Sequence, residues 1–314
     1  MLHGDGEPLL IEYQDAVSHF CYVAMKRDIS EDPRFSMLSP GVCFDLETPY
    51  GYGGPLSDGP VSEESQKRFL TEMREYCVEE GIVEQFVRFH PLLGNHETVP
   101  LAFELRYLHD TIFIDTSDQE RIMSNMDCKN RNMVRKAVKN GVTIERKPVE
   151  AYGEFLRMYE ETMKKDQASQ YYFFNKDYFE EQSSLRDHAC LFYAMREGIP
   201  IAGAIFYFND RFLHYHLAGT HTEYRKYAPG NLMLYEAACW ANKNGIGKFH
   251  LGGGMAPDDN LFGFKKQFNK NGRLPFWVGR TIFDPSAYDR LLNLREQTDP
   301  CFDRNNSRMT QYRF

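Results

Sequence analysis

Residues 190–251 decide the fold, and they read CLFYAMREGIPIAGAIFYFNDRFLHYHLAGTHTEYRKYAPGNLMLYEAACWANKNGIGKFHL. Three short apolar stretches in the first half of this segment alternate with the pairs Glu197-Gly198 and Asn209-Asp210, which favour tight turns. This spacing predicts an antiparallel meander of three strands. The strands are expected at residues 190–195, 201–208 and 212–218.

The second half of the same segment changes to a helical pattern. Residues 231–244 are mostly apolar with little polar face, which predicts a well-buried helix. Asn244-Gly245 is a typical helix end, and residues 248–251 then form a further apolar stretch. A strand, a crossover helix and a second strand predict a parallel βαβ unit joined to the meander.

The first half of the chain repeats this arrangement more weakly. It predicts a strand at 42–46, a helix at 62–80 and a strand at 83–89, followed by a hairpin whose arms are 101–107 and 111–115. One or two helices are expected in residues 117–140. The fold class is therefore α/β (α+β), and we place two tandem domains at residues 1–130 and 131–314.

Composition excludes several function classes. The 314-residue chain has 37 basic and 45 acidic residues and a net charge of -8, which disfavours generic nucleic-acid binding. No apolar run approaches the roughly 18 residues that span a bilayer, so no membrane span is expected. Seven cysteines lie scattered without a CxxC spacing, which indicates no zinc or thioredoxin-type site and a reducing compartment. We expect a cytoplasmic protein without a metal.

The first candidate site is the entry to the predicted buried helix. Arg225, Pro229, Gly230 and Asn231 lie between a strand and this helix. The unpaired N–H groups of a helix N-terminus favour phosphate, and Gly230 allows a ligand close to the backbone. The alternative is an ordinary turn between a strand and a helix.

The second candidate site follows the last strand of the βαβ unit. Gly252-Gly253-Gly254 gives an open, side-chain-free bend. Aromatic residues around Lys265 and Lys266 can then hold one ammonium near this bend, where it would stabilise an oxyanion formed on an ester or thioester carbonyl. The alternative is a solvated lysine pair.

The third candidate site is a loop in the first half of the chain. Residues 48–58 read TPYGYGGPLSD and hold Tyr50, Tyr52 and Asp58. The tyrosines can line an acceptor cleft between the domains, and Asp58 can accept a proton from an attacking ammonium. The alternative role for Asp58 is to form a turn before Gly59-Pro60.

Together these motifs resemble the FemABX family and its GNAT-type relatives. The resemblance lies in Gly54-Pro55-Leu56-Ser57-Asp58, in the basic segment and strand of residues 131–144, in the Tyr-x-x-x-x-Pro-Gly helix entry at 224–230, and in Phe-Lys-x-x-Phe at 264–268. The ordered set covers roughly residues 40 to 285. It implies two tandem GNAT-like domains, each a mixed sheet flanked by helices.

The resemblance also implies a transferase of the acyltransferase or aminoacyltransferase class that forms amides. In FemABX proteins the donor is aminoacyl-tRNA and the acceptor is a peptidoglycan precursor, which implies a role in cell-wall or polysaccharide biosynthesis. Lys265, Gly253 and Phe264 would lie at the donor end, and Asp58 with Tyr50 and Tyr52 in the acceptor cleft. The acceptor would be an amine on a cell-wall precursor, sugar or peptide.

The donor has two alternatives, because the sequence departs from the GNAT pattern. The pyrophosphate loop of GNAT enzymes is degenerate here, since Arg225 lies five residues before Gly230 and no second glycine follows. The donor is thus acyl-CoA or aminoacyl-tRNA, with no tightly bound cofactor. A basic segment holds Lys129, Arg131, Arg135, Lys136 and Lys139. If tRNA is the donor, this segment would supply an RNA-docking face. The alternative is a solvated surface without a ligand. The alternative to an enzyme is a non-catalytic GNAT-like module that binds a peptide or saccharide.

Overall fold

The computed structural model describes residues 6–314, and these form two compact units. The first unit runs to Leu108 and resumes over Pro275–Phe314, and the second unit is His109–Leu274. This division differs from the predicted sequential domains 1–130 and 131–314. The reason is that the chain returns to the first unit after completing the second, so that residues 275–314 pack with the first hundred.

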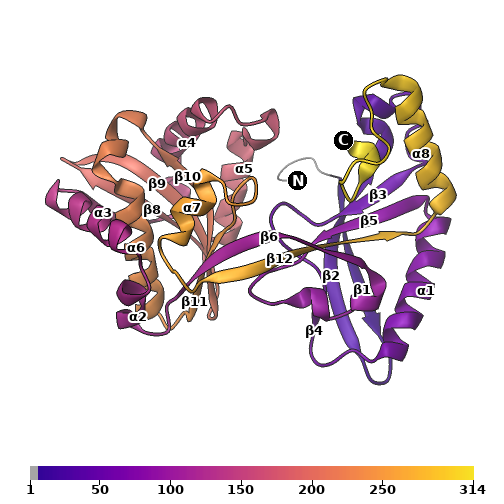
Figure 1. Cartoon of the computed structure of the whole chain (residues 1–314), viewed down its shortest axis with the longest axis horizontal. Coiled ribbons are helices and arrows are strands. Elements are labelled where there is room, and N and C mark those ends of the chain that lie inside the picture. Colours follow the sequence, from indigo (N-terminus) through magenta and orange to yellow (C-terminus); the bar gives the residue numbers. More distant parts are fainter. Residues whose placement is uncertain (1–5) are drawn as a thin grey trace. The chain divides into compact units, whose positions relative to one another are not determined.

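The first unit is built on a mixed sheet with the strand order β1-β2-β3-β5-β12, and β4 pairs with β2 (Figure 1). Only β3 and β5 run parallel in this set, and helix α1 (Glu63–Glu79) connects them. The strands are β1 (Glu7–Gln14), β2 (His19–Asp28), β3 (Phe44–Glu47), β4 (Leu56–Ser57), β5 (Ile82–Arg88) and β12 (Arg273–Ile282).

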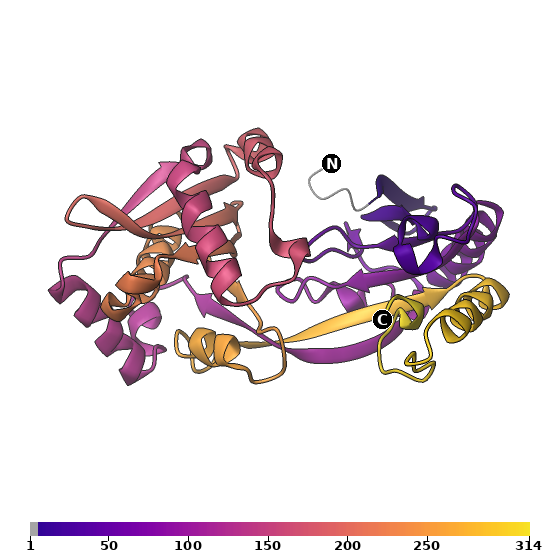
Figure 2. The same cartoon turned by 90° about the horizontal axis from the view of Figure 1, so that it is seen from above.

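Two helices pack against β5, and the later of them in the sequence is the yellow helix of Figure 2. Helix α1 begins at its cap Ser62, whose side chain accepts from the Ser65 N–H, and it buries Phe69, Met73 and Cys77. Helix α8 (Pro285–Thr298) packs with a separate cluster that includes Val83 on β5. The unit therefore has helix layers over two distinct apolar cores.

The second unit contains the strands that the sequence predicts most clearly. The strand order is β6-β11-β10-β9-β8-β7, and only β10 and β11 are parallel. Helix α6 (Pro229–Lys243) connects β10 to β11, as the predicted βαβ unit requires. The strands are β6 (Glu104–Asp115), β7 (Thr143–Pro148), β8 (Ala189–Arg196), β9 (Ile199–Phe208), β10 (Phe212–Thr220) and β11 (Lys248–Gly252).

Helices cover this second sheet as well. Helices α2 (Gln119–Ser124) and α3 (Cys128–Lys139) pack against α6 (Figure 1). Helix α4 (Gly153–Lys165) packs on β9 and β10, and the short α5 (Lys176–Glu181) follows it. Gly219 on β10 allows this contact, because a Cβ there would lie 2.4 Å from the Tyr159 backbone nitrogen.

The predicted hairpin at residues 101–115 is wrong. The chain forms one continuous strand, β6, through His109-Asp110 instead of turning there. Residues 112–115 pair with β11 in the second unit, whereas residues up to Leu108 belong to the first. The strand is therefore one of two connections between the units; the other is β12.

Candidate functional site

Strands β10 and β11 diverge at the centre of the second unit. They pair through only three pairs of residues, the last of which is His214 with His250. Beyond it β10 has an irregularity between Tyr215 and Leu217 and continues along β9, while β11 ends at Gly252 along β6. Because the two parallel strands diverge, a side chain from another part of the unit can lie between their ends.

Lys265 supplies that side chain. It lies on the short helix α7 (Asn260–Lys266) and is only 8% exposed. Its Nζ donates to the Gly253 carbonyl oxygen at 2.7 Å and lies 5.8 Å from the centre of the Tyr215 ring. The predicted glycine bend and the predicted lysine are therefore in direct contact.

Burial lowers the pKa of Lys265 to about 8, and the charge of Asp259 opposes this shift. The side chain is thus still mostly an ammonium at neutral pH, but it carries its charge in an apolar setting. A charge so placed acts on a nearby oxyanion more strongly than it would in water.

The loop between Gly253 and α7 is organised by Asp259. Its carboxylate accepts from the backbone N–H groups of Met255 at 2.6 Å, Ala256 at 3.0 Å and Phe262 at 2.7 Å. Burial opposes ionisation of this carboxyl, but these N–H groups outweigh it and lower the pKa of Asp259. Gly254 is required here, since a Cβ would lie 2.2 Å from an Asp259 oxygen.

The neighbouring residues of α7 show which lysine points inward. Phe268 is fully buried, and the half-buried Phe264 packs edge-on against it at 5.3 Å between ring centres. Lys266 is exposed. Of the two lysines, Lys265 is therefore the buried one and Lys266 the exposed one.

The entry to α6 has the local features that the sequence predicts. Ala228 adopts a left-handed conformation with φ of 55° and makes no side-chain cap, and Pro229 begins the helix. A Cβ on Gly230 would have no heavy atom within 4 Å. Arg225 is exposed on the preceding 3-10 turn (Thr222–Tyr227). The first turn of α6 is therefore open beside Gly230.

Asn130 on α3 is a residue of this region that the sequence analysis missed. It is fully buried, and its Oδ1 accepts from the Asn231 Nδ2 at 2.7 Å. Among the described residues no partner is found for the Asn130 Nδ2. The basic segment and the α6 entry are thus joined through two amides, a contact between residues 101 positions apart that local pattern does not reveal.

A second feature that the sequence analysis missed is a row of hydrogen-bonded polar side chains at the point where β10 and β11 diverge. The Nδ1 atoms of His214 and His250 lie 3.2 Å apart, and the His250 Nε2 lies 3.0 Å from the Thr111 Oγ1. His250 is fully buried. Two facing imidazole nitrogens at this distance share a proton, because one must donate and the other accept. The only sequence signal is a histidine inside each of two apolar strands.

The predicted acceptor residues lie in the first unit. Asp58 has a side chain 75% exposed, and its Oδ2 lies 3.4 Å from the His19 Nδ1. Tyr52 packs edge-on against Phe276 at 5.2 Å, and Tyr50 is partly exposed. Lys265 belongs to the second unit, so the two proposed catalytic residues are on different units.

Among residues 6–314, no group of three or more histidine, cysteine, aspartate or glutamate residues is arranged to hold a metal ion. No helix in that same range combines the length and the apolar character needed to cross a membrane.

Comparison with protein families identifies one domain. Residues 129–266 match the model of the acetyltransferase (GNAT) domain, and this range lies wholly within the second unit. No curated protein sequence matches the chain.

Solved structures share the fold over most of the chain. FemX is similar with a TM-score of 0.65 and 15% identity, covering 90% of each chain. L-PGS from Bacillus licheniformis has a TM-score of 0.52 and 13% identity, covering 95% of this chain and 89% of that one. A tandem GNAT protein from the clavulanic acid pathway has a TM-score of 0.51 and 12% identity, covering 89% and 85%. The predicted fold class is confirmed.

Proposed function

Because residues 129–266 match the model of the GNAT acetyltransferase domain, we propose that the chain transfers an acyl or aminoacyl group from an activated donor to an amine. The family match and the shared fold support acyl transfer in general. The reaction joins the acceptor nitrogen to the donor carbonyl carbon and forms an amide. The bond from that carbon to the leaving sulfur or oxygen breaks.

The observation that carries this proposal is the contact between Lys265 and the Gly253 carbonyl. One N–H of the ammonium binds that carbonyl at 2.7 Å, which fixes the nitrogen where β10 and β11 diverge. Two further N–H groups then remain for a ligand oxygen. When an amine attacks an ester or thioester, the carbonyl oxygen becomes negative, and a fixed ammonium stabilises this charge more than the ground state.

The donor is proposed to bind at the α6 entry. Both acyl-CoA and aminoacyl-tRNA carry phosphates, and the open first turn of α6 at Pro229, Gly230 and Asn231 suits a phosphate. Arg225 adds an exposed cation on the preceding turn. Gly253 and Phe264 would border the reacting end of the donor, next to Lys265.

The acceptor is proposed to be an amine on a cell-wall precursor, sugar or peptide, bound by the loop of Tyr50 and Tyr52. An acceptor amine arrives as an ammonium and must lose a proton before or during attack. Asp58 is one candidate for this proton. His214 is the second candidate, because its contact with the buried His250 orients the ring and can share the added charge.

The proposal is tested with the full chain and two classes of donor. The protein is incubated with amine acceptors and either a set of acyl-CoAs or a set of aminoacyl-tRNAs. Product amides are detected by mass spectrometry, and donor binding is measured by calorimetry. Amide formation above the Lys265→Met background supports the proposal.

Two other outcomes would overturn it. Saccharide or peptide binding without turnover of either donor class would identify a non-catalytic binding module instead. Turnover that is equal in the wild-type chain and in Lys265→Met would remove the lysine from the chemistry.

A further inference from the structure

The loop proposed to bind the acceptor is held by one arginine. Arg88 at the end of β5 donates from Nη2 to the carbonyls of Thr48 at 2.7 Å and Pro49 at 3.3 Å, and from Nε to that of Gly51 at 3.1 Å. Its Nη1 pairs with Glu47. Because a guanidinium is planar and rigid, this set of bonds fixes the backbone on both sides of Tyr50.

Glu47 connects Arg88 to a second arginine. Its two carboxylate oxygens pair with Arg88 and with Arg27 on β2. Arg27 in turn donates from Nε to Asp45 at 2.8 Å. Asp45 is fully buried, so its charge depends on these partners for compensation.

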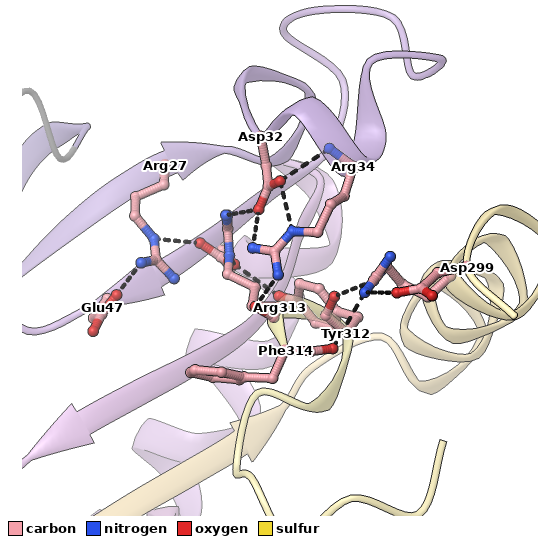
Figure 3. Close-up of polar contacts among 10 residues, drawn as sticks. Arg27, Asp32, Arg34, Glu47, Asp299, Tyr312, Arg313 and Phe314 are labelled. Atoms are coloured by element: carbon pink, nitrogen blue, oxygen red, sulfur yellow. Dashed lines mark hydrogen bonds and ion pairs between the residues drawn. The ribbon is translucent and has the colours of Figure 1, made fainter. Parts of the chain in front are cut away.

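The other partners of Asp45 come from the segment after α8. The Tyr312 hydroxyl donates to Asp45 at 2.8 Å, and the Arg313 Nε donates to it at 2.7 Å. Arg313 also pairs with Asp32 at 3.3 Å, and Arg34 donates to the Arg313 carbonyl (Figure 3). Residues 312–313 are therefore fixed to the same carboxylate that supports Arg27.

These contacts form a continuous chain of charged groups within the first unit. It runs from Arg313 through Asp45, Arg27 and Glu47 to Arg88 and the loop. Each acid lies between two arginines, so removal of one cation leaves a poorly compensated buried charge. The nearest arginine is then expected to move toward it and to change its contacts with the next acid.

We propose that Arg313 is a positioning residue for the loop of residues 48–54, acting through Asp45, Arg27, Glu47 and Arg88. The inference rests on the proposed function only in one respect, namely that this loop binds the acceptor. Arg313 itself is assigned no contact with substrate. Its role is to keep the charge chain in the arrangement that lets Arg88 hold the loop carbonyls.

Hydrogen exchange of the loop amides tests this directly. Two of them are protected, since the Thr48 N–H donates to the Phe86 carbonyl and the Gly53 N–H to the Arg88 carbonyl. Exchange is measured by mass spectrometry in the wild type, Arg313→Met, Arg88→Met and the double variant. We expect at least fivefold faster exchange of this peptide in Arg313→Met, while peptides from α1 keep their wild-type rates.

Arg304→Met is the matched control. Arg304 lies in the same segment and is equally well bonded, to Asp289, Glu296 and Asn293, but none of these belongs to the charge chain. The loop in this variant should exchange as in the wild type. Arg313→Lys keeps one cation beside Asp45 and should restore part of the protection, and it also serves if Arg313→Met does not fold.

The double variant shows whether Arg313 acts on the loop through Arg88 or whether the two arginines act on it independently. If Arg313 acts through Arg88, the double variant should exchange no faster than Arg88→Met alone. Additive increases, or unchanged loop exchange in Arg313→Met, would overturn the inference. This result does not depend on catalysis. In an active preparation Arg313→Met should raise the acceptor KM more than it lowers kcat, so failure of the proposed function is recognised separately.

Discussion

The Lys265 ammonium donates to the Gly253 carbonyl oxygen over 2.7 Å, across twelve residues of chain. This bond joins the bend after β11 to the helix that carries the lysine. It also gives the buried cation a fixed direction, because Asp259 constrains the backbone between them.

Lys265→Met should lower the rate of amide formation about 100-fold, because one fixed donor to an oxyanion contributes about 3 kcal/mol to the transition state. Met keeps much of the apolar stem, so folding and donor binding should persist. The measurement is kcat together with donor affinity. Lys266→Met is the matched control, since Lys266 is exposed. Greater damage from Lys266→Met would show that the assignment is wrong.

The same substitution should stabilise the fold at neutral pH. The pKa of Lys265 is about 8 in the folded state and about 10.5 when unfolded, so the unfolded chain binds the proton more tightly. This cost is fully present below pH 8 and disappears as the pH rises to 10.5. At pH 7 Lys265→Met should gain about 2 kcal/mol, after allowance for the unpaired Gly253 carbonyl. Urea unfolding at pH 7 and pH 10 measures the difference, and an equal gain at both would contradict it.

Glu84 should make the first unit less stable as the pH rises. This side chain is fully buried in register with Asp45, and burial, with the charge of Asp45, raises the pKa of Glu84 to about 8. The folded state therefore holds the proton that the unfolded state loses near pH 4.5, and the stabilisation present below pH 4.5 is lost between pH 4.5 and 8.

Glu84→Gln removes this dependence. At pH 8 it should raise the free energy of unfolding by about 4 kcal/mol, and at pH 4 it should match the wild type. Denaturant titrations at the two pH values decide the outcome. Glu75→Gln, at an exposed position on α1, is the control and should have no such effect. A pH-independent shift in Glu84→Gln would show that Glu84 is ionised throughout.

Tyr50→Ala should weaken acceptor binding and raise the acceptor KM about tenfold while changing the melting temperature little. Tyr52→Ala should also destabilise the unit by about 1 to 2 kcal/mol, because its ring packs on Phe276. Steady-state kinetics and thermal unfolding separate the two effects. If Tyr50→Ala lowers stability as much as Tyr52→Ala does, both rings are core residues.

Binding of tRNA should depend on the exposed basic residues of α3 if tRNA is the donor. Arg135 and Lys136 are exposed, whereas Arg131 is partly committed to the Met126 carbonyl. Arg135→Glu/Lys136→Glu should reduce affinity and lower the salt dependence of binding by about two phosphate contacts. Filter binding from 50 to 200 mM salt measures both. Salt-independent binding, or none in the wild type, would exclude tRNA as the donor.

The sequence predicts those parts of the fold whose signals are local. The meander, helix α6 and its proline entry follow from turn pairs, apolar runs and a buried helix pattern over 62 consecutive residues. His109-Asp110 resembles a turn for the same local reason, but pairing of residues 112–115 with β11 keeps β6 extended. Tertiary pairing thus outweighs the local preference.

Part of the candidate site could likewise be predicted from local sequence, and part could not. Lys265 and the glycine bend could be predicted because they are close in sequence, and the direction of the lysine follows from the packing of Phe262 and Phe268. Arg88 and Asn130 could not, because each meets its partners at least 37 residues away in the chain. A contact of this kind has no periodicity and no local motif.

The interruption of the first unit by the second determines the order in which a nascent chain can complete its folding. Residues 109–274 leave the ribosome before β12, whose residues 278–282 pair with β5. The second unit can therefore close first, while β5 still has an open edge and Asp45 still lacks its partner Tyr312. During this interval the open edge of β5 can pair with a wrong strand. Residues 275–314 cover that edge when they arrive, and they then protect the first unit from aggregation.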